Sequence, residues 1–241
     1  GHHDFGSLGK LVSTTAVFNT PFMYRDPVHA MHATDPRQSP ALQKINQELI
    51  EKGNMRIVAS LFQGTRELTS KEKVLSPKDM QGKKYRGVPI KLWSSMITGM
   101  GAVATPVEVS ELATALATGL VVGQENPLPN IYTLKLYEVQ KYCSMTGHMW
   151  DGQWVLANGK MWAKLPKDLQ AIVTKHINGF AMQQRDDVLA NRIYQQLSSA
   201  VAGSQEYTAM VSSTPAATAT SRPSARGPPT AGPSRGRALP R

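Results

Sequence analysis

Short β-like runs alternate with helical stretches along most of the chain, and this alternation constrains the fold more than any other feature. Runs rich in apolar and β-branched residues predict strands, and the segments between them have helical periodicity. The six predicted strands lie at 14–18, 55–62, 84–88, 102–109, 120–125 and 153–158. Such alternation is typical of an α/β protein, and we expect a largely parallel sheet.

Two of the predicted helices have clear end signals. The segment 39–53 places its apolar residues on one face, and Gly53 would provide a left-handed stop. The segment 110–119 would begin at Ser110 as its N-cap and end at Gly119. Both segments are therefore predicted to be helices with defined ends.

The last predicted helix is unusually long. It begins at Pro166 and stays compatible with a helix to about residue 201, interrupted only by Gly179. A helix of about 35 residues would be on the order of 50 Å long, which exceeds one small domain. We therefore expect this helix to span two lobes.

The formal charge of +10 raises the question of a nucleic-acid partner. Residues 205–241 hold five arginines and one acidic residue, and they are rich in Pro, Ala, Ser, Thr and Gly. Such a composition predicts a disordered basic tail. The other charges are mixed in sign and form no basic stripe, so we expect no nucleic-acid partner; a nucleic-acid or scaffold role for the tail is kept as an alternative.

Other classes of protein find little support in the sequence. No apolar run approaches the roughly 18 residues of a membrane span, so we expect a protein that is not itself embedded in a membrane. The single cysteine, Cys143, lies in an apolar run and is interpreted as an inert packed thiol. The pair His29 and His32 lacks a third ligand, so we expect no metal and no cofactor. No nucleophile and base stand at informative spacing, although an enzyme on a similar fold is kept as an alternative.

Polar residues at the end of an apolar run suggest a binding site. Gln124, Glu125 and Asn126 follow the run, and Pro127 ends it, while Arg86 stands at the end of another predicted strand. Ligands of parallel α/β sheets bind at the carboxyl ends of strands. The planar fork of an arginine and the amide of an asparagine suit a carboxylate, so this pattern predicts an anion site. The alternatives are an arginine in a surface salt bridge and a simple turn at 124–126.

Several motifs in sequence carry a family resemblance. They include "PKDMQGKKYRGVPIKLW", "MGAVATPVEVSELATALATGLVVGQENPLPNIYTLKLYEVQKYCSMTGHMW" and "LANGKMWAKLPKDLQAIV". The upstream stretches "FNTPFMYRDPVHA" and "FQGTRELTSKEKVLSPKDMQGKK" continue the match in the same order. From about residue 14 to 200 the chain resembles the substrate-binding proteins of tripartite ATP-independent periplasmic (TRAP) transporters, the DctP-like family.

This resemblance implies a two-lobed, periplasmic-binding-protein-like (Venus flytrap) α/β fold. It further implies a receptor in the bacterial periplasm that binds a small organic acid between its lobes and delivers it to the membrane permease subunits of the transporter. The lobe boundaries implied are 1–63 plus 152–190 for lobe I, and 64–151 plus 191–204 for lobe II. C4-dicarboxylates, 2-oxo acids, sugar acids and aromatic acids all remain open as ligands.

The resemblance also assigns candidate ligand contacts. Arg86 would be the main carboxylate clamp, Asn126 its hydrogen-bonding companion, and Arg66 would lie near the cleft. His148 and Trp150 fall at positions that approach the pocket in relatives. The alternatives are a strand-end histidine at 148, a core tryptophan at 150, and an Arg66 that pairs with a nearby acid, Glu67 or Asp79.

Two departures from the family pattern qualify this expectation. Relatives usually read "VDGQEN" where this chain has "VVGQEN", so an acidic residue is absent at Val122. Relatives also begin with further strands of lobe I and end with further strand and helix. We therefore expect an N-terminally truncated fragment with an atypical C-terminal tail.

Overall fold

The computed structural model describes residues 1–190. The expected disordered tail at 205–241, the lobe II segment at 191–204 and the end of the long predicted helix lie outside the described residues. The helices and strands below are those of the described part.

Six strands form one sheet in the order β1-β6-β2-β5-β3-β4. Their bounds are β1 His2–Asp4, β2 Met55–Ser70, β3 Lys84–Gly87, β4 Val103–Pro106, β5 Gly123–Pro127 and β6 Tyr142–Asn158. Strand β3 pairs in parallel with β4 and β5, whereas β1 with β6, β2 with β6 and β2 with β5 are antiparallel. The expectation of a largely parallel sheet was therefore wrong.

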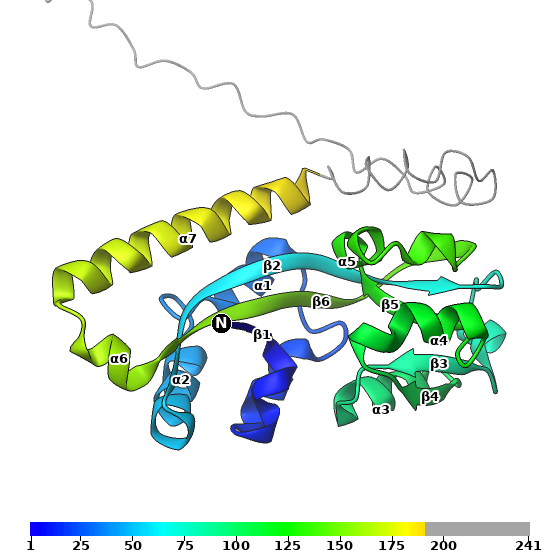
Figure 1. Ribbon diagram of the computed structural model, residues 1–241, viewed down its shortest axis with the longest axis horizontal. Coiled ribbons are helices and arrows are strands. Elements are labelled where there is room, and N and C mark those ends of the chain that lie inside the picture. The colour runs from blue at the N-terminus through cyan, green and yellow to red at the C-terminus, as the bar shows by residue number, and fades with distance from the viewer. Residues whose placement is uncertain (191–241) are drawn as a thin grey trace, which may run out of the picture.

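The two longest strands, β2 and β6, run side by side through the middle of the molecule (Figure 1). Their pairing contains three register shifts, two of which lie between Phe62 and Gly64 and between Arg66 and Leu68. Gly64 has a positive φ of 98°, which a residue with a side chain rarely adopts. Polar residues and this glycine interrupt the apolar pattern in mid-strand, so the sequence predicted only the first half of β2.

Two further strand predictions needed correction. Residues 14–18 lie in a 3₁₀-helix, η2 Ser13–Asn19, where the Thr15 hydroxyl donates to the Val12 carbonyl oxygen at 2.8 Å. This local hydrogen bond offers the backbone an alternative to a sheet ladder. The strand predicted at 120–125 is displaced to β5, so Gln124, Glu125 and Asn126 lie within the strand and not beyond its end.

The helices are short apart from two. Their bounds are α1 Pro27–Thr34, α2 Pro40–Gly53, α3 Lys91–Gly99, α4 Leu112–Thr118, α5 Leu128–Thr133, α6 Gly159–Lys164 and α7 Lys167–Leu189, with 3₁₀-helices η1 Phe5–Lys10, η2, η3 Pro77–Met80, η4 Val109–Glu111 and η5 Leu136–Glu138. The prediction for α2 is confirmed, but its left-handed residue is Asn54, not Gly53. Helix α4 ends at the left-handed Gly119 as predicted, whereas Ser110 lies in η4 and does not cap it.

Helix α7 packs along β2, as Figure 1 shows, and its own residues Asn178 and Ala181 are buried. It continues through Gly179 without interruption. Its last residues, Val188 and Leu189, line a cavity of about 210 Å³ together with residues of α5, on the other side of the molecule from the start of α7. Within residues 1–190, no helix is both long and apolar enough to cross a membrane.

Separate hydrophobic cores lie on the two sides of the molecule. The first lobe, expected at 1–63 and 152–190, has one core that packs Phe5, Leu8, Val12, Phe18, Leu42, Ile45, Leu49, Ile57 and Trp154. The second lobe, expected at 64–151 within the described residues, contains two clusters, one around Leu116 and Ile131 and one around Tyr85 and Ile97. Cys143 is buried in the first of these clusters, as a packed thiol would be, and burial raises its pKa to about 12.

A buried amide joins α2 to β2. Asn46 Nδ2 donates to the Ile57 carbonyl oxygen at 3.0 Å, and its Oδ1 accepts from the Ile57 N–H at 2.8 Å. We expect Asn46→Ala to lower the free energy of unfolding by about 2 to 4 kcal/mol, because it leaves two buried backbone groups unpaired. Urea denaturation measures the change. Gln47→Ala is the control, since Gln47 is exposed and its side chain donates to Glu51 on the surface of the same helix; an equal loss in both variants would contradict the prediction.

Candidate functional site

Arg66 lies in mid-β2 and is surrounded by carboxylates. Its Nε lies 2.5 Å from Glu125 Oε2 on β5, and its Nη2 donates to Glu125 Oε1 at 3.0 Å and to the Glu125 carbonyl oxygen at 2.9 Å. Its Nη1 forms an ion pair with Asp151 Oδ2 on β6. Because β2 is the strand between β5 and β6, it brings the guanidinium to both acids. One alternative from the sequence paired Arg66 with Glu67 or Asp79. The structure pairs it with Glu125 and Asp151 instead.

One guanidinium thus faces two buried carboxylates. Burial by itself raises the pKa of Glu125, but the charge of Arg66 and hydrogen bonds from His148 and Arg66 lower it to about 2. Burial dominates at Asp151, where it raises the pKa to about 6 against the opposing charge of Arg66. Glu125 is therefore the carboxylate that Arg66 holds ionised, and Asp151 is the one that takes up a proton first.

The raised pKa of Asp151 predicts a pH dependence of stability. In the unfolded chain Asp151 loses its proton near its ordinary pKa of 3.8, but in the folded protein only near 6. The folded state binds more protons between these values, so stability falls as the pH rises from about 4 to about 6. We expect wild type to lose on the order of 2 kcal/mol relative to Asp151→Asn over this window.

Urea denaturation of both proteins at a series of pH values measures this difference. Asp151→Asn is itself the reference, because it cannot ionise and carries every other titrating group. A difference that stays constant from pH 4 to 6 would show that Asp151 ionises at its ordinary pKa.

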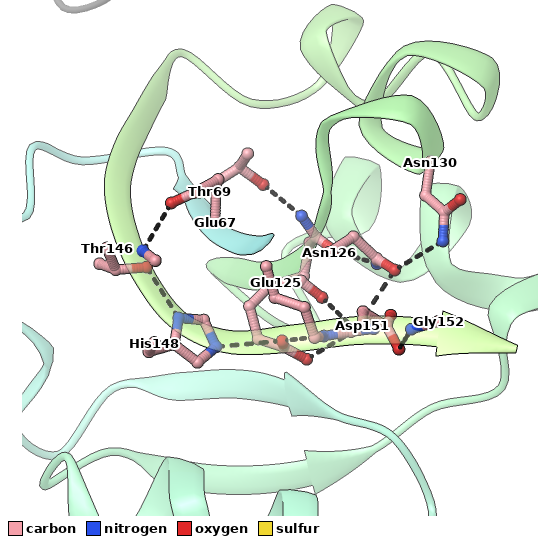
Figure 2. Close-up of polar contacts among 12 residues, drawn as sticks. Glu67, Thr69, Glu125, Asn126, Asn130, Thr146, His148, Asp151 and Gly152 are labelled. Atoms are coloured by element: carbon pink, nitrogen blue, oxygen red, sulfur yellow. Dashed lines mark hydrogen bonds and ion pairs between the residues drawn. The ribbon is translucent and has the colours of Figure 1, made fainter. Parts of the chain in front are cut away.

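His148 extends the same network, as Figure 2 shows. Its Nε2 lies 3.2 Å from Glu125 Oε2, and its Nδ1 lies 2.7 Å from the Thr146 hydroxyl. Because an ionised carboxylate only accepts, Nε2 is the protonated nitrogen. His148 is buried and belongs to the surroundings of Glu125 rather than to an open surface.

Asn126 is also engaged on several sides (Figure 2). Its Oδ1 lies 3.3 Å from both Arg66 Nη2 and Asn130 Nδ2, and its Nδ2 donates to Gln124 Oε1 at 2.5 Å. Gln124 in turn donates to the Thr69 hydroxyl at 2.7 Å. The three consecutive polar residues of β5 therefore form a connected network that fixes the amide of Asn126.

Arg86 differs from Arg66 in its partners. It lies at the end of β3, is 3% exposed, and its Nε donates to the Val107 carbonyl oxygen at 2.9 Å. In the described part of the chain it forms no ion pair with a carboxylate. Burial and then the nearby charge of Arg66 lower the pKa of Arg86 to about 10. An anion that paired with this buried guanidinium would offset the cost of its burial.

Trp150 lies apart from this network. Its ring stacks on Phe62 of β2 at 5.7 Å between centroids, and it lines two cavities, one of about 220 Å³ and the 210 Å³ cavity at the end of α7. The structure therefore brings Arg66, Asn126 and His148 into one network with Arg86 beside it. Trp150 faces the junction of β2, β6 and α7.

Sequence reasoning missed two members of this site. Asp151 was not singled out, although a buried arginine in mid-strand requires a buried acid, and a search for acids on neighbouring strands could have found it. Trp93 of α3 was missed as well: its ring lies 5.6 Å from Arg66 Cζ. Glu125 was noted only as part of a polar run, although it is the main partner of Arg66.

A family model described as bacterial extracellular solute-binding protein, family 7 (DctP) matches residues 1–220. The chain belongs to this family. Among curated relatives of the DctP family, the chain is 34% identical to the sialic acid-binding periplasmic protein SiaP of Vibrio cholerae over 174 residues, which cover 72% of this chain and 53% of SiaP. The chain thus spans about half the length of this DctP relative.

Solved structures of TRAP periplasmic solute-binding proteins share this fold. A TRAP periplasmic solute-binding protein from Sulfitobacter sp., solved with bound α-D-taluronate, has a TM-score of 0.75 and 26% identity, with 86% of this chain and 66% of that chain covered. One from Roseobacter denitrificans, with bound L-galactonate, has a TM-score of 0.72 and 28% identity, with 85% and 68% covered. The resemblance seen in the sequence and the two-lobed α/β fold are confirmed.

Proposed function

We propose that this chain acts as an extracytoplasmic receptor that binds a small organic acid between its two lobes and passes it to the permease subunits of a TRAP transporter. Membership of the DctP family and relatives that bind sialic acid, taluronate and galactonate support the proposal. Such a receptor would work in the bacterial periplasm. It would bind its ligand without turnover, since association and release require no covalent chemistry.

One observation carries this proposal: Arg86 is buried and has no carboxylate partner within residues 1–190. A guanidinium out of water is costly unless an anion pairs with it. The cost is visible in the pKa of Arg86, which burial lowers. A ligand carboxylate could accept two hydrogen bonds from its fork and so remove this cost.

The other predicted contacts take different roles in the proposal. Asn126 would donate its remaining amide hydrogen to the ligand, since one hydrogen of Nδ2 already goes to Gln124. Arg66 has two carboxylates of its own, so it would contribute mainly by fixing Asn126 and Glu125. His148 would act through Glu125, and Trp150 from the edge of the junction between the lobes.

Binding would be coupled to a movement of the lobes. Strands β2 and β6 pass through both lobes, and the charge of Asp4 on β1 in the first lobe acts on Arg86 in the second. A ligand that contacts both lobes only in the closed form shifts the population toward that form. The boundaries proposed for the lobes are those expected from the sequence. The chain would pass from one lobe to the other near residues 63 and 152.

A thermal-shift screen of organic acids on the full 241-residue chain tests the proposed function. A ligand at about a hundred times its dissociation constant stabilises the folded state by about 2.7 kcal/mol, which is visible as a raised melting temperature. Calorimetry then gives stoichiometry and affinity, and mass spectrometry checks that the acid is unchanged. A screen without any hit among C4-dicarboxylates, 2-oxo acids, sugar acids and aromatic acids would contradict the proposal, and conversion of a hit to product would favour an enzyme.

A further inference from the structure

Arg66, Glu125 and Asp151 form a cluster in which one cation faces two acids. The three side chains come from the neighbouring strands β2, β5 and β6, and all three residues are buried. With both acids ionised, the negative charges in the cluster would exceed the positive charge, and an uncompensated charge out of water is costly. A proton on one of the two carboxyl groups makes the cluster neutral, so the fold provides a place for a proton.

The hydrogen bonds indicate which acid takes this proton. Glu125 faces two nitrogens of Arg66, Nε and Nη2, and also lies 3.2 Å from His148 Nε2. Asp151 forms an ion pair with the remaining nitrogen, Nη1, and its other oxygen accepts from the Gly152 N–H at 2.9 Å (Figure 2). Fewer donors stabilise the ionised form of Asp151, and burial raises its pKa to about 6. Asp151 is therefore the acid on which the proton resides.

A cavity in the first lobe lies against Asp151. Its volume is about 220 Å³, and Asp151 lines it together with Trp150 and residues of α1, β2 and α7. A cavity of this size holds several water molecules. Water in the cavity would exchange a proton with Asp151 without passing the predicted carboxylate clamp.

The other groups around this cavity are engaged elsewhere or serve as controls. Its charged and titratable lining residues, besides Asp151, are Tyr24, His32, Asp35, Arg37 and Arg185. Arg37 pairs with Asp35, and Arg185 pairs with Asp186. Burial raises the pKa of Tyr24 above its usual value, so its phenol stays protonated. His32 is the histidine of this cavity, and its replacement is a control below.

Three groups on the strands also surround Asp151. The charge of Asp4 on β1, which pairs with β6, adds to the effect of burial on Asp151. Glu67 on β2 accepts from the Gly147 N–H at 2.8 Å, and burial raises its pKa as well. His148 lies on β6 itself and is buried. Glu67 and His148 are therefore the competing acceptors for a proton.

The predicted carboxylate clamp shares its electrostatic surroundings with Asp151. Arg66, Glu125 and Asp4 interact electrostatically with Arg86, and the same three residues interact with Asp151. A ligand carboxylate at Arg86 would place a further negative charge among these groups. Like charges disfavour each other's ionised forms, so this charge makes a proton on Asp151 more favourable.

We propose that Asp151 is a proton-binding site, and that a ligand carboxylate at Arg86 draws a proton onto it. This inference rests on the proposed function. The coupling is reciprocal, so a proton on Asp151 strengthens binding of the carboxylate by the same factor. Affinity therefore increases as the pH falls, although the ligand itself stays ionised.

The expected size of the effect follows from linkage. A coupling of about tenfold lies within the range usual for linked sites. With a pKa of about 6 for Asp151 in the ligand-free protein, such a coupling gives about fivefold tighter binding at pH 6 than at pH 8. At pH 6.5 it gives an uptake of about half a proton for each bound ligand.

Calorimetry on the full chain tests this inference with pyruvate, benzoate, fumarate and L-galactonate as probes, one from each class of acid in the screen. Carboxyl groups ionise at about pH 4, so the probes stay ionised from pH 6 to pH 8. The affinity of the tightest probe is measured across this range. Proton uptake is measured at pH 6.5 in PIPES and in imidazole, because the different ionisation enthalpies of the two buffers reveal the number of protons taken up.

Three variants assign the proton to a residue. Asp151→Asn resembles the protonated acid, so at pH 8 it should bind the probe at least as tightly as wild type, with no gain at pH 6 and no proton uptake. His32→Gln and Glu67→Gln are the matched controls: each removes another titratable group near Asp151 and should keep the pH dependence of wild type. The melting temperature of each variant shows whether it is folded, and the proton uptake of wild type tests the inference without any variant.

The outcomes separate the two proposals. A chain that binds no acid in the screen contradicts the proposed function. A chain that binds an acid with the same or lower affinity at pH 6 than at pH 8, and takes up no proton, contradicts only the coupling to Asp151. The same holds if Asp151→Asn keeps the proton uptake of wild type, because the proton would then go to another group such as His148 or Glu67.

Discussion

Replacement of Arg86 by methionine is expected to lower the affinity for a small carboxylate by at least about a hundredfold. Each hydrogen bond to a charged group contributes roughly 1.5 to 3 kcal/mol, and the arginine fork can donate two of them. Calorimetry with the best acid from the thermal-shift screen measures the loss. Because Arg86 forms no ion pair within residues 1–190 and burial lowers its pKa, the variant should be as stable as wild type or more stable.

Two further variants sharpen this result. Lys84→Met removes a positive charge from the same strand, but its side chain is exposed, so it should reduce affinity only slightly. Arg86→Lys keeps the charge and loses the fork, so it should fall between wild type and Arg86→Met. Equal affinity in wild type and Arg86→Met would show that the carboxylate binds elsewhere.

Replacement of Arg66 by methionine is expected to lower the free energy of unfolding by about 3 to 5 kcal/mol, because it leaves two buried carboxylates, Glu125 and Asp151, without their cation. Urea denaturation at pH 7 measures the loss. The defect should shrink at lower pH, since protonation of Asp151 removes one uncompensated charge; loss of Arg66 moves the pKa of Asp151 upward from its wild-type value of about 6.

The triple variant Arg66→Met, Glu125→Gln, Asp151→Asn separates the two parts of this effect. It removes the uncompensated charges, so it should recover most of the stability lost in the single variant. A single variant that loses less than about 1 kcal/mol would mean that the three charged groups are not desolvated as the structure describes them.

The sequence predicted local features well where a short-range signal defines them. Ser39 caps α2 by accepting from the Leu42 N–H at 3.2 Å, and Gly119 adopts the left-handed conformation that ends α4. The motif around Arg86 and Asn126 indicated the family, and the family model and related structures confirmed it. The roles of Arg86, Asn126, Arg66, His148 and Trp150 in binding stay predictions.

What the sequence could not predict depends on pairing between distant segments. Asp151 is 85 positions from Arg66, and only the antiparallel pairing of β2 with β6 brings them together. This pairing, with the antiparallel pairs β1–β6 and β2–β5, made the sheet mixed rather than largely parallel.

The register shifts in the β2–β6 pair are expected to influence the movement proposed for the lobes. Two hydrogen-bonded strands resist stretching and in-plane shear, because either would break the ladder between them, but they twist with little loss of bonding. The extra residues near Phe62, Gly64 and Arg66 leave local backbone groups outside the regular ladder, which makes torsion easiest there. We therefore expect rotation about the β2–β6 pair to be the easiest motion between the lobes. Amide protons beside these shifts should exchange with solvent sooner than those in the regular parts of both strands.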